Sequence, residues 1–186
     1  MLAILIIIFV VAADQLTKRW AADALQPVGS IPVIRNVLHL TYAENTGAAF
    51  SILKNYRWVF ISLTSVVLVV ILYLLFVRRL RRPLTVVALS MLAGGGIGNM
   101  IDRIGQGYVV DMIDFRLINF AIFNVADSFI TVGTILFAIL YLFTNGALEP
   151  AAKRSKKDAP VFYGAFRYKN SLSSDASKEL GGHERD

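Results

Sequence analysis

Residues 98–129 read GNMIDRIGQGYVVDMIDFRLINFAIFNVADSF, a short segment with several aspartates that joins two uncharged hydrophobic runs. A carboxylate beside a membrane span is costly unless it is paired, solvated or functional, so each of these acids needs a reason. Asp111 and Asp127 stand out because each follows a stretch of small or β-branched apolar residues, surroundings that would raise a carboxyl pKa. The stretch therefore predicts an acid/base pair at the edge of a membrane.

The composition indicates an integral membrane protein. The 186 residues are 56% hydrophobic and 17% charged, and several uncharged runs near the length of a membrane span are too long for a soluble core of this size. The formal charge of +6 is concentrated in the basic residues at 78–82 and 153–157. These clusters flank hydrophobic runs, so they indicate membrane topology and no nucleic-acid surface. Cysteine is absent and the two histidines, His39 and His183, are far apart, which disfavours a zinc site or a Ser-His-Asp triad.

Four transmembrane helices are predicted, near residues 1–22, 57–77, 84–104 and 124–144. Residues 1–13 also have the length of a signal-peptide core, but they lack a basic leader and a helix-compatible segment follows directly, so we interpret them as part of the first span. The last span is placed after Asn124 because Asn124 is a good N-cap and Asp127 lies three residues on, as in a capping box. This start puts Asp127 at the rim of the membrane.

Polar residues on the predicted helices are spaced to share faces. Asp14 and Lys18 are four residues apart and are expected to pair near the outer end of the first span. Asn99, Asp102 and Arg103 form one polar face at the outer end of the third span. The same span carries glycines with small-xxx-small spacing, at 94 and 98, which predict close helix packing.

Between the first two spans the pattern changes to breakers and alternating β-branched residues, from Gln26 to Tyr42, which predicts a small β-structured excursion outside the bilayer. The segment 44–50 is too small and flexible for a strand interior, and Asn45 and Gly47 suit a tight turn. The predicted fold class is all-α integral membrane, a four-helix transmembrane bundle with this extracytoplasmic excursion. Residues 1–148 form the membrane domain, and residues 149–186 are expected to be a polar, disordered cytoplasmic tail.

The basic clusters place both termini in the cytoplasm, so Asp14, Asn45, Asp102, Asp111 and Asp127 all gather near the outer leaflet. Two carboxylates within a few ångströms cannot both ionise easily, and such a pair can share a proton. The ionised member then takes a proton from water while the protonated member polarises a carbonyl, which is the chemistry of an aspartic protease and needs no metal or cofactor.

Five motifs occur in order along residues 1–148, and the chain that carries them resembles lipoprotein signal peptidase. They are DQLTK at 14–18, ENTGAAFS at 44–51, GNMIDR at 98–103, VVDMIDF at 109–115 and FNVADS at 123–128. Met112 departs from the family pattern, in which many members have an aromatic residue. The tail after Leu148 has no counterpart in the motif series.

The resemblance implies an aspartyl endopeptidase of the bacterial cytoplasmic (inner) membrane that removes the signal peptide of prolipoproteins next to a diacylglyceryl-modified cysteine. Its catalytic pair falls on Asp111 and Asp127. It further implies contact with membrane lipid and sensitivity to peptide inhibitors of the globomycin type. Supporting or substrate-binding roles fall on Asp14, Lys18, Asn45, Gly47, Asn99, Asp102, Arg103 and Asn124.

Two other classes of protein are compatible with clustered acids near a membrane. A transporter or ion-binding bundle would use them to carry protons or cations, although its path would show polar residues along the depth of several helices. A metal-dependent membrane hydrolase would use them as ligands, which the lack of nearby histidines disfavours.

Overall fold

The computed structural model describes residues 1–47, 56–144 and 147–150. Its long helices are α1 (Leu2–Ala24), α2 (Arg57–Leu72, continued by a π-helical turn over Tyr73–Val77), α3 (Pro83–Gly105) and α4 (Val125–Phe143). Strands β1 (Ser30–Ile34), β2 (Leu38–Asn45) and β3 (Val109–Phe115) form an antiparallel sheet in the order β1-β2-β3. The helices lie where the hydrophobic runs predicted them, which confirms a mostly helical fold with a small sheet.

Three helices in the described part of the chain are long and apolar enough to cross a membrane: α2 with its π-helical turn, α3 and α4. Helix α1 is as long as α3, but its first 18 residues already include Asp14, Lys18 and Arg19. The first two of these charged side chains are buried inside the protein, whereas most large apolar residues before them are exposed. The helix therefore has an apolar outer surface over its first half and a polar inner face at its end.

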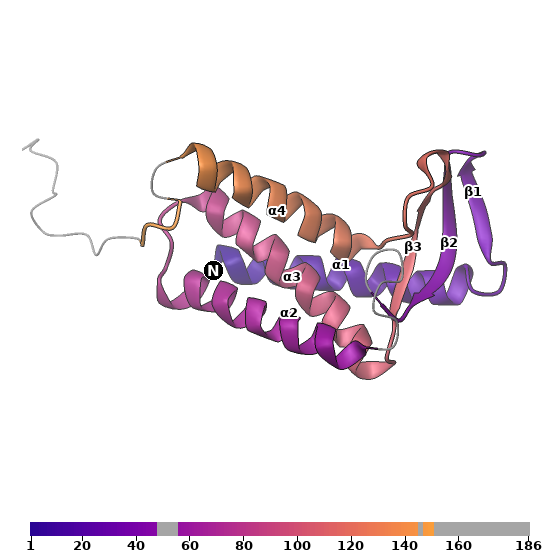
Figure 1. The fold of residues 1–186 in the computed structure, drawn as a ribbon, viewed down its shortest axis with the longest axis horizontal. Helices are drawn as coiled ribbons and strands as arrows, with labels where there is room; N and C mark the ends of the chain where they lie inside the picture. The colour runs from indigo at the N-terminus through magenta and orange to yellow at the C-terminus, as the bar shows by residue number, and fades with distance from the viewer. Residues whose placement is uncertain (48–55, 145–146, 151–186) are drawn as a thin grey trace, which may run out of the picture. The chain divides into compact units, whose positions relative to one another are not determined.

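Helix α3 is the centre of the bundle and contacts α1, α2 and α4 (Figure 1). Its glycines permit this because they leave room for the neighbouring helices: a Cβ at Gly94 would lie 2.7 Å from Val10 of α1, and one at Gly95 would lie 2.6 Å from the carbonyl oxygen of Ala126 in α4. Gly98 meets Asp14 of α1 in the same way. The prediction of close helix packing at Gly94 and Gly98 is confirmed, and it is α1 that approaches both.

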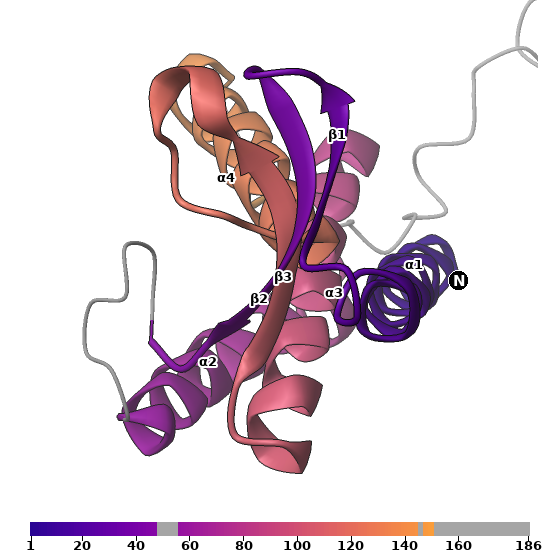
Figure 2. The ribbon, with the colours of Figure 1, turned by 90° about the vertical axis from the view of Figure 1, so that its right-hand side faces the viewer.

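The sheet stands at the end of the bundle where α4 begins, and α1 extends beneath it (Figures 1 and 2). A small apolar core joins the two: Ala21 and Leu25, at the end of α1, pack against Val110 and Met112 of β3. Met112, which stands where the family pattern often has an aromatic residue, is buried here. This difference therefore affects the packing under the sheet and not the polar site.

The sheet differs from the sequence prediction in two respects. Strand β2 includes Glu44 and Asn45, which we expected outside any strand, because both pair with the first residues of β3. The strand β3 was itself not predicted, since its residues pair with β2 across more than 60 positions of sequence and carry no alternation of their own. Apart from Glu149 and Pro150, the predicted tail lies outside the described residues.

Candidate active site

Asp111 and Asp127 reach the site from different elements. Asp111 lies on β3 and is 2% exposed, and Asp127 lies in the first turn of α4. Asn124 caps α4 as predicted, because its side chain accepts from the Asp127 N–H while the Asp127 carboxylate accepts from the Asn124 N–H. This capping box fixes the Asp127 carboxylate at the helix N-terminus, where the helix dipole favours negative charge.

Three asparagines hold the two carboxylates. Asn45 Nδ2 donates to Asp111 Oδ2 over 2.9 Å, and Asn124 Nδ2 donates to Asp111 Oδ1 over 2.6 Å. Asn99 Nδ2 donates to Asp127 Oδ1 over 2.7 Å. The Asn99 and Asn124 side chains are also joined, with Asn124 Nδ2 donating to Asn99 Oδ1 over 3.1 Å. A continuous hydrogen-bonded chain therefore connects Asp111 with Asp127.

The titration of Asp111 is strongly perturbed. Burial raises the pKa of its carboxyl group, and the nearby charge of Asp127 raises it further. Hydrogen bonds from Asn45 and Asn124 offset part of this effect, and the resulting pKa of Asp111 is about 7. A carboxyl group with this pKa exchanges its proton near neutral pH, as a general acid must.

Behind the asparagines lies a buried charged cluster built on Lys18. Its Nζ is 2.8 Å from Asp14 Oδ2, 2.9 Å from Asp102 Oδ2 and 2.8 Å from Asn99 Oδ1, so all three ammonium protons have acceptors. The expected pairing of Asp14 with Lys18 is confirmed. Asp102, which the sequence placed on one polar face with Asn99 and Arg103, pairs with Lys18 of α1.

Asp14 Oδ1 also accepts a hydrogen bond from the Ala126 N–H of α4 over 3.0 Å. The cluster thus ties α1 and α3 to the first turn of α4, which carries Asp127. Since Asn99 Oδ1 accepts from Lys18, the Asn99 amide must turn its NH₂ group toward Asp127. The charged cluster accordingly orients the group that holds the carboxylate.

Gln15 belongs to this cluster and was missed from the sequence. Its Nε2 donates to Asp102 Oδ1 over 3.0 Å and to the Gly98 carbonyl over 3.2 Å. The only sequence signal was its position beside Asp14 in the DQLTK motif, and adjacent residues on a helix usually point to different faces.

Arg103 and Gly47 close the other side of the site. Arg103 Nη2 donates to the Gly47 carbonyl over 3.0 Å, and its guanidinium lies 5.0 Å from the centre of the Phe60 ring, a cation–π contact. The Gly47 N–H donates to Asn45 Oδ1 over 2.9 Å, which is the predicted tight turn. This turn presents the Asn45 amide to Asp111.

Asp114 lies elsewhere. In the sheet, Asp111 pairs with Ala43 and Asp114 pairs with His39. Successive side chains of a strand point to opposite faces, and Asp114 is three residues from Asp111, so the two side chains lie on opposite faces of β3. Burial raises the pKa of Asp114, but hydrogen bonds from Arg116 and Thr41 outweigh burial and hold that pKa below the usual value. Asp114 is therefore an ion-paired structural residue of the sheet.

Both carboxylates open on one cavity of about 500 Å³. Its polar wall is formed by Asn45, Asn99 and Arg103 together with Asp111 and Asp127, and the rest is mostly apolar. The apolar wall comes from the segment 120–123 before α4 and from residues along α4, among them Ile130 and Val132. Because Val132 is exposed on the outer surface of α4, the cavity opens toward that flank of the bundle.

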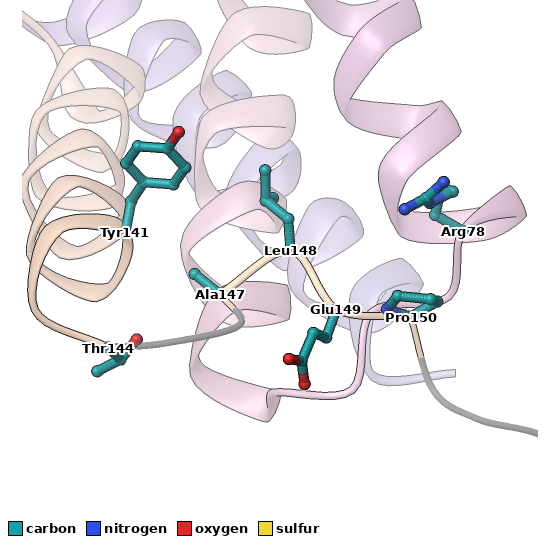
Figure 3. A pocket seen from close by; sticks show the side chains of 7 residues that line it. All are labelled: Arg78, Tyr141, Thr144, Ala147, Leu148, Glu149 and Pro150. Carbon is teal, nitrogen blue, oxygen red and sulfur yellow. The ribbon is translucent and has the colours of Figure 1, made fainter.

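A second cavity of about 390 Å³ lies at the other end of α4 (Figure 3). It is lined by Arg78, Tyr141 and Thr144 and by the segment 147–150, and Glu149 is its one carboxylate. It therefore offers no carboxylate pair. In the described part of the chain no group of three or more His, Cys, Asp or Glu side chains is placed to hold a metal ion.

The fold and the site define a membrane enzyme with two carboxylates, a buried Asp111 and a half-buried Asp127, on one cavity at one end of a helical bundle. Comparisons with known proteins agree. The family model for signal peptidase (SPase) II matches residues 6–143. The lipoprotein signal peptidase of Caldanaerobacter subterraneus subsp. tengcongensis is 50% identical over 145 residues, which is 78% of this chain and 99% of that protein. The lipoprotein signal peptidase of Clostridioides difficile is 45% identical over 143 residues, 77% of this chain and 96% of that protein.

A solved structure described as a bacterial membrane enzyme, determined by the in meso method at 2.3 Å resolution, superposes with a TM-score of 0.70 at 36% identity, covering 82% of this chain and 94% of that one. The chain belongs to the signal peptidase II family, the lipoprotein signal peptidases. It is accordingly a multi-pass membrane peptidase that removes signal peptides from prolipoproteins.

Proposed function

We propose that this chain is an aspartyl endopeptidase whose catalytic residues are Asp111 and Asp127. The observation that carries the proposal is the shared cavity: two carboxylates from separate elements open on it, and one hydrogen-bonded chain of asparagines holds both. Such a pair can activate water without a cofactor.

In the proposed mechanism Asp127 is the base. Its carboxylate takes a proton from a water molecule, whose oxygen attacks the scissile carbonyl carbon, while protonated Asp111 donates a hydrogen bond to the carbonyl oxygen. The raised pKa of Asp111 supports its role as the acid. As the tetrahedral intermediate collapses and the C–N bond breaks, Asp127 gives its proton to the leaving amine. Asn99 and the helix dipole stabilise the ionised Asp127 carboxylate before it takes the proton and after it gives the proton up.

The remaining site residues have positioning roles in this proposal. Asn45 and Asn124 orient Asp111, and Asn99 orients Asp127. Arg103 lines the cavity and holds the Gly47 turn against it. Asp14, Lys18 and Asp102 form the buried framework that fixes Asn99 and α4.

The proposed substrate is a prolipoprotein cleaved before a cysteine that already carries diacylglycerol. The cavity supports this proposal because it is apolar along α4 and polar at the dyad, so acyl chains can lie on the lipid-exposed flank while the peptide reaches the carboxylates. Peptide inhibitors of the globomycin type would compete for the same cavity.

The proposed topology has four spans with both termini in the cytoplasm and cleavage inside the membrane near the outer leaflet. The arginines that follow α2 support this orientation, since basic residues favour the cytoplasmic side. Helix α1 serves as the additional span because its buried charges are paired internally and its exposed residues are apolar. The membrane domain then ends near residue 148, and the cytoplasmic tail follows.

The test compares cleavage of one precursor with and without diacylglycerol on its cysteine, by purified protein assayed both with and without a metal chelator. We expect cleavage only of the lipidated precursor, at the bond before the cysteine. Chelator-sensitive turnover, or equal turnover of both precursors, would refute the proposal.

A further inference from the structure

The free end of the sheet carries apolar side chains that the fold does not bury. Ile34 is 55% exposed, Leu117 is 69% exposed and Ile118 is 68% exposed. Phe115 and Phe120 extend the same surface and are also exposed. We call these five residues the tip patch. Monomeric soluble surfaces rarely gather so many large apolar residues, and such a patch usually marks a protein or membrane contact.

Contacts in the structure bring the tip patch together. Ile34 of β1 pairs with Leu38 of β2, and Leu38 pairs with Phe115 of β3, so Ile34 and Phe115 lie on the two outer strands of the sheet, on either side of β2. A 3₁₀ turn, Arg116–Ile118, follows β3, and the Leu117 N–H lies 3.4 Å from the Val37 carbonyl. The turn is thereby held beside the β1–β2 hairpin.

Aromatic packing connects the tip patch to the catalytic cavity. The Phe115 ring stacks on Phe123 with centroids 6.0 Å apart, and Phe120 meets the edge of Phe123 at 5.8 Å. Phe120 and Phe123 both line the cavity that contains the dyad. The patch and the cavity wall are therefore parts of one continuous apolar surface.

The position of the patch identifies its surroundings. The β1–β2 hairpin and the segment that leads into α4 lie on the α4 side of the bundle, away from α2, in both views (Figures 1 and 2). The same flank holds the exposed residue Val132, where the cavity opens. Residues 117–120 precede the span α4 by only a few positions, so the membrane surface is within reach of the patch.

We propose that the tip patch inserts into the outer leaflet of the membrane beside the mouth of the catalytic cavity. The partner is phospholipid: the apolar side chains enter the acyl boundary, and Arg35 and Arg116 lie next to them in sequence to meet the phosphates. Arg35 is exposed at the hairpin turn. The Arg116 side chain is 43% exposed, although its Nε donates to Asp114 over 2.8 Å and its Nη2 donates to the Ser30 hydroxyl over 2.9 Å and to the Thr41 hydroxyl over 3.4 Å. A combination of exposed apolar and basic residues suits a lipid interface better than a second copy of a basic chain.

The role that follows for the patch, which rests on the proposed function, is to hold the leaflet against the mouth of the cavity. A substrate anchored by diacylglycerol then moves from the leaflet to the dyad along a continuous apolar surface. Loss of the patch should impair capture of lipid-anchored substrate and leave the chemical step unchanged.

The first experiment measures insertion without any turnover. Single cysteines are placed at Leu117 or Ile118 in the naturally cysteine-free chain with Asp111→Asn, and an environment-sensitive fluorophore is attached in phosphatidylethanolamine and phosphatidylglycerol vesicles. Gln26→Cys, just past the end of α1, is the water-exposed control, and Val69→Cys, on the exposed face of α2, is the hydrocarbon control.

We expect spin-labelled phospholipids to quench the fluorophore at 117 and 118 much more than at 26. Equal quenching at 117, 118 and 26 would overturn the proposal. A fluorescence signal at 117 that depends on protein density and not on the spin label would also overturn it, since a second copy of the chain would then cover the patch. Because the variant is inactive, failure of the proposed function leaves this result intact.

The second experiment uses Leu117→Ser with Ile118→Ser, residues outside the cavity. In vesicles we expect KM for a lipidated precursor to rise on the order of tenfold with kcat unchanged. Hydrolysis of a short lipidated peptide presented in detergent should stay at the wild-type rate. An unchanged KM in vesicles, or an equal loss with both substrates, would contradict the proposed role.

Discussion

Replacing Lys18 by methionine tests the buried framework beneath the dyad. Lys18 is 4% exposed, and Asp14 and Asp102 are 0% and 6% exposed. Methionine keeps much of the volume of lysine but removes the charge that both carboxylates face at 2.8 and 2.9 Å. Breaking a buried ion pair by removing one partner costs about 3–5 kcal/mol, and here two carboxylates lose their cation together. We expect Lys18→Met to lower Tm in detergent by roughly 6 °C or more.

Two matched variants decide whether charge causes the loss. Arg19→Met removes a neighbouring cation whose pair with Asp23 is 80% and 63% exposed, so it should change stability by less than about 1 kcal/mol. Asp14→Asn combined with Lys18→Met removes one of the stranded carboxylates and should be more stable than Lys18→Met alone by roughly 1–3 kcal/mol. Equal loss in Lys18→Met and Arg19→Met, or no recovery in the double variant, would refute the electrostatic reasoning.

Three further predictions follow from the packing, the titration and the tail. Gly95→Ala should lower Tm because its Cβ would lie 2.6 Å from the Ala126 carbonyl oxygen. Gly105→Ala, whose Cβ would have nothing within 4 Å, should raise stability by about 0.4–1 kcal/mol. Thermal unfolding of the two variants and the wild type measures both changes. The folded-state pKa of Asp111 is raised from 3.8 to about 7, so the contribution of this group to stability is fully present below pH 3.8 and is lost as pH rises through 7. The Tm of Asp111→Asn should therefore rise relative to the Tm of the wild type as pH increases across this window. A difference in Tm that stays constant with pH would contradict the assignment. Truncation after Ala152 should leave cleavage intact in correctly inserted protein, since the tail is predicted to be disordered and on the opposite side from the dyad.

The sequence was sufficient for the features that depend on local pattern. Hydrophobic length located the helices, and the capping-box pattern at Asn124 and Asp127 correctly predicted where α4 begins. Helical spacing predicted the pair of Asp14 with Lys18. When the interacting residues are close in sequence, as in a helix cap or an i,i+4 pair, the spacing of residue types is enough to predict the contact.

Features that depend on distant pairing were not predictable in the same way. Strand β3 exists because β2 supplies its hydrogen-bonding partners, and Asp102 pairs with Lys18 because glycines let α1 and α3 approach. Gln15 shows the limit most clearly, since its role depends on a helix face that only the packed bundle defines.

The central claim is that Asp111 and Asp127 together perform the chemistry. The most direct measurement is turnover of a lipidated precursor by Asp111→Asn, Asp127→Asn and Asp114→Asn, each purified, shown to be folded by Tm, and assayed with chelator. An amide can neither take nor give the proton, so each dyad variant should lose roughly 10²–10⁴-fold in kcat, and the double variant should be scarcely slower than either single one. Asp114→Asn should retain activity because Asp114 lies on the other face of β3 and pairs with Arg116. Substantial turnover by either dyad variant, or an equal loss in Asp114→Asn, would contradict the assignment of the catalytic pair.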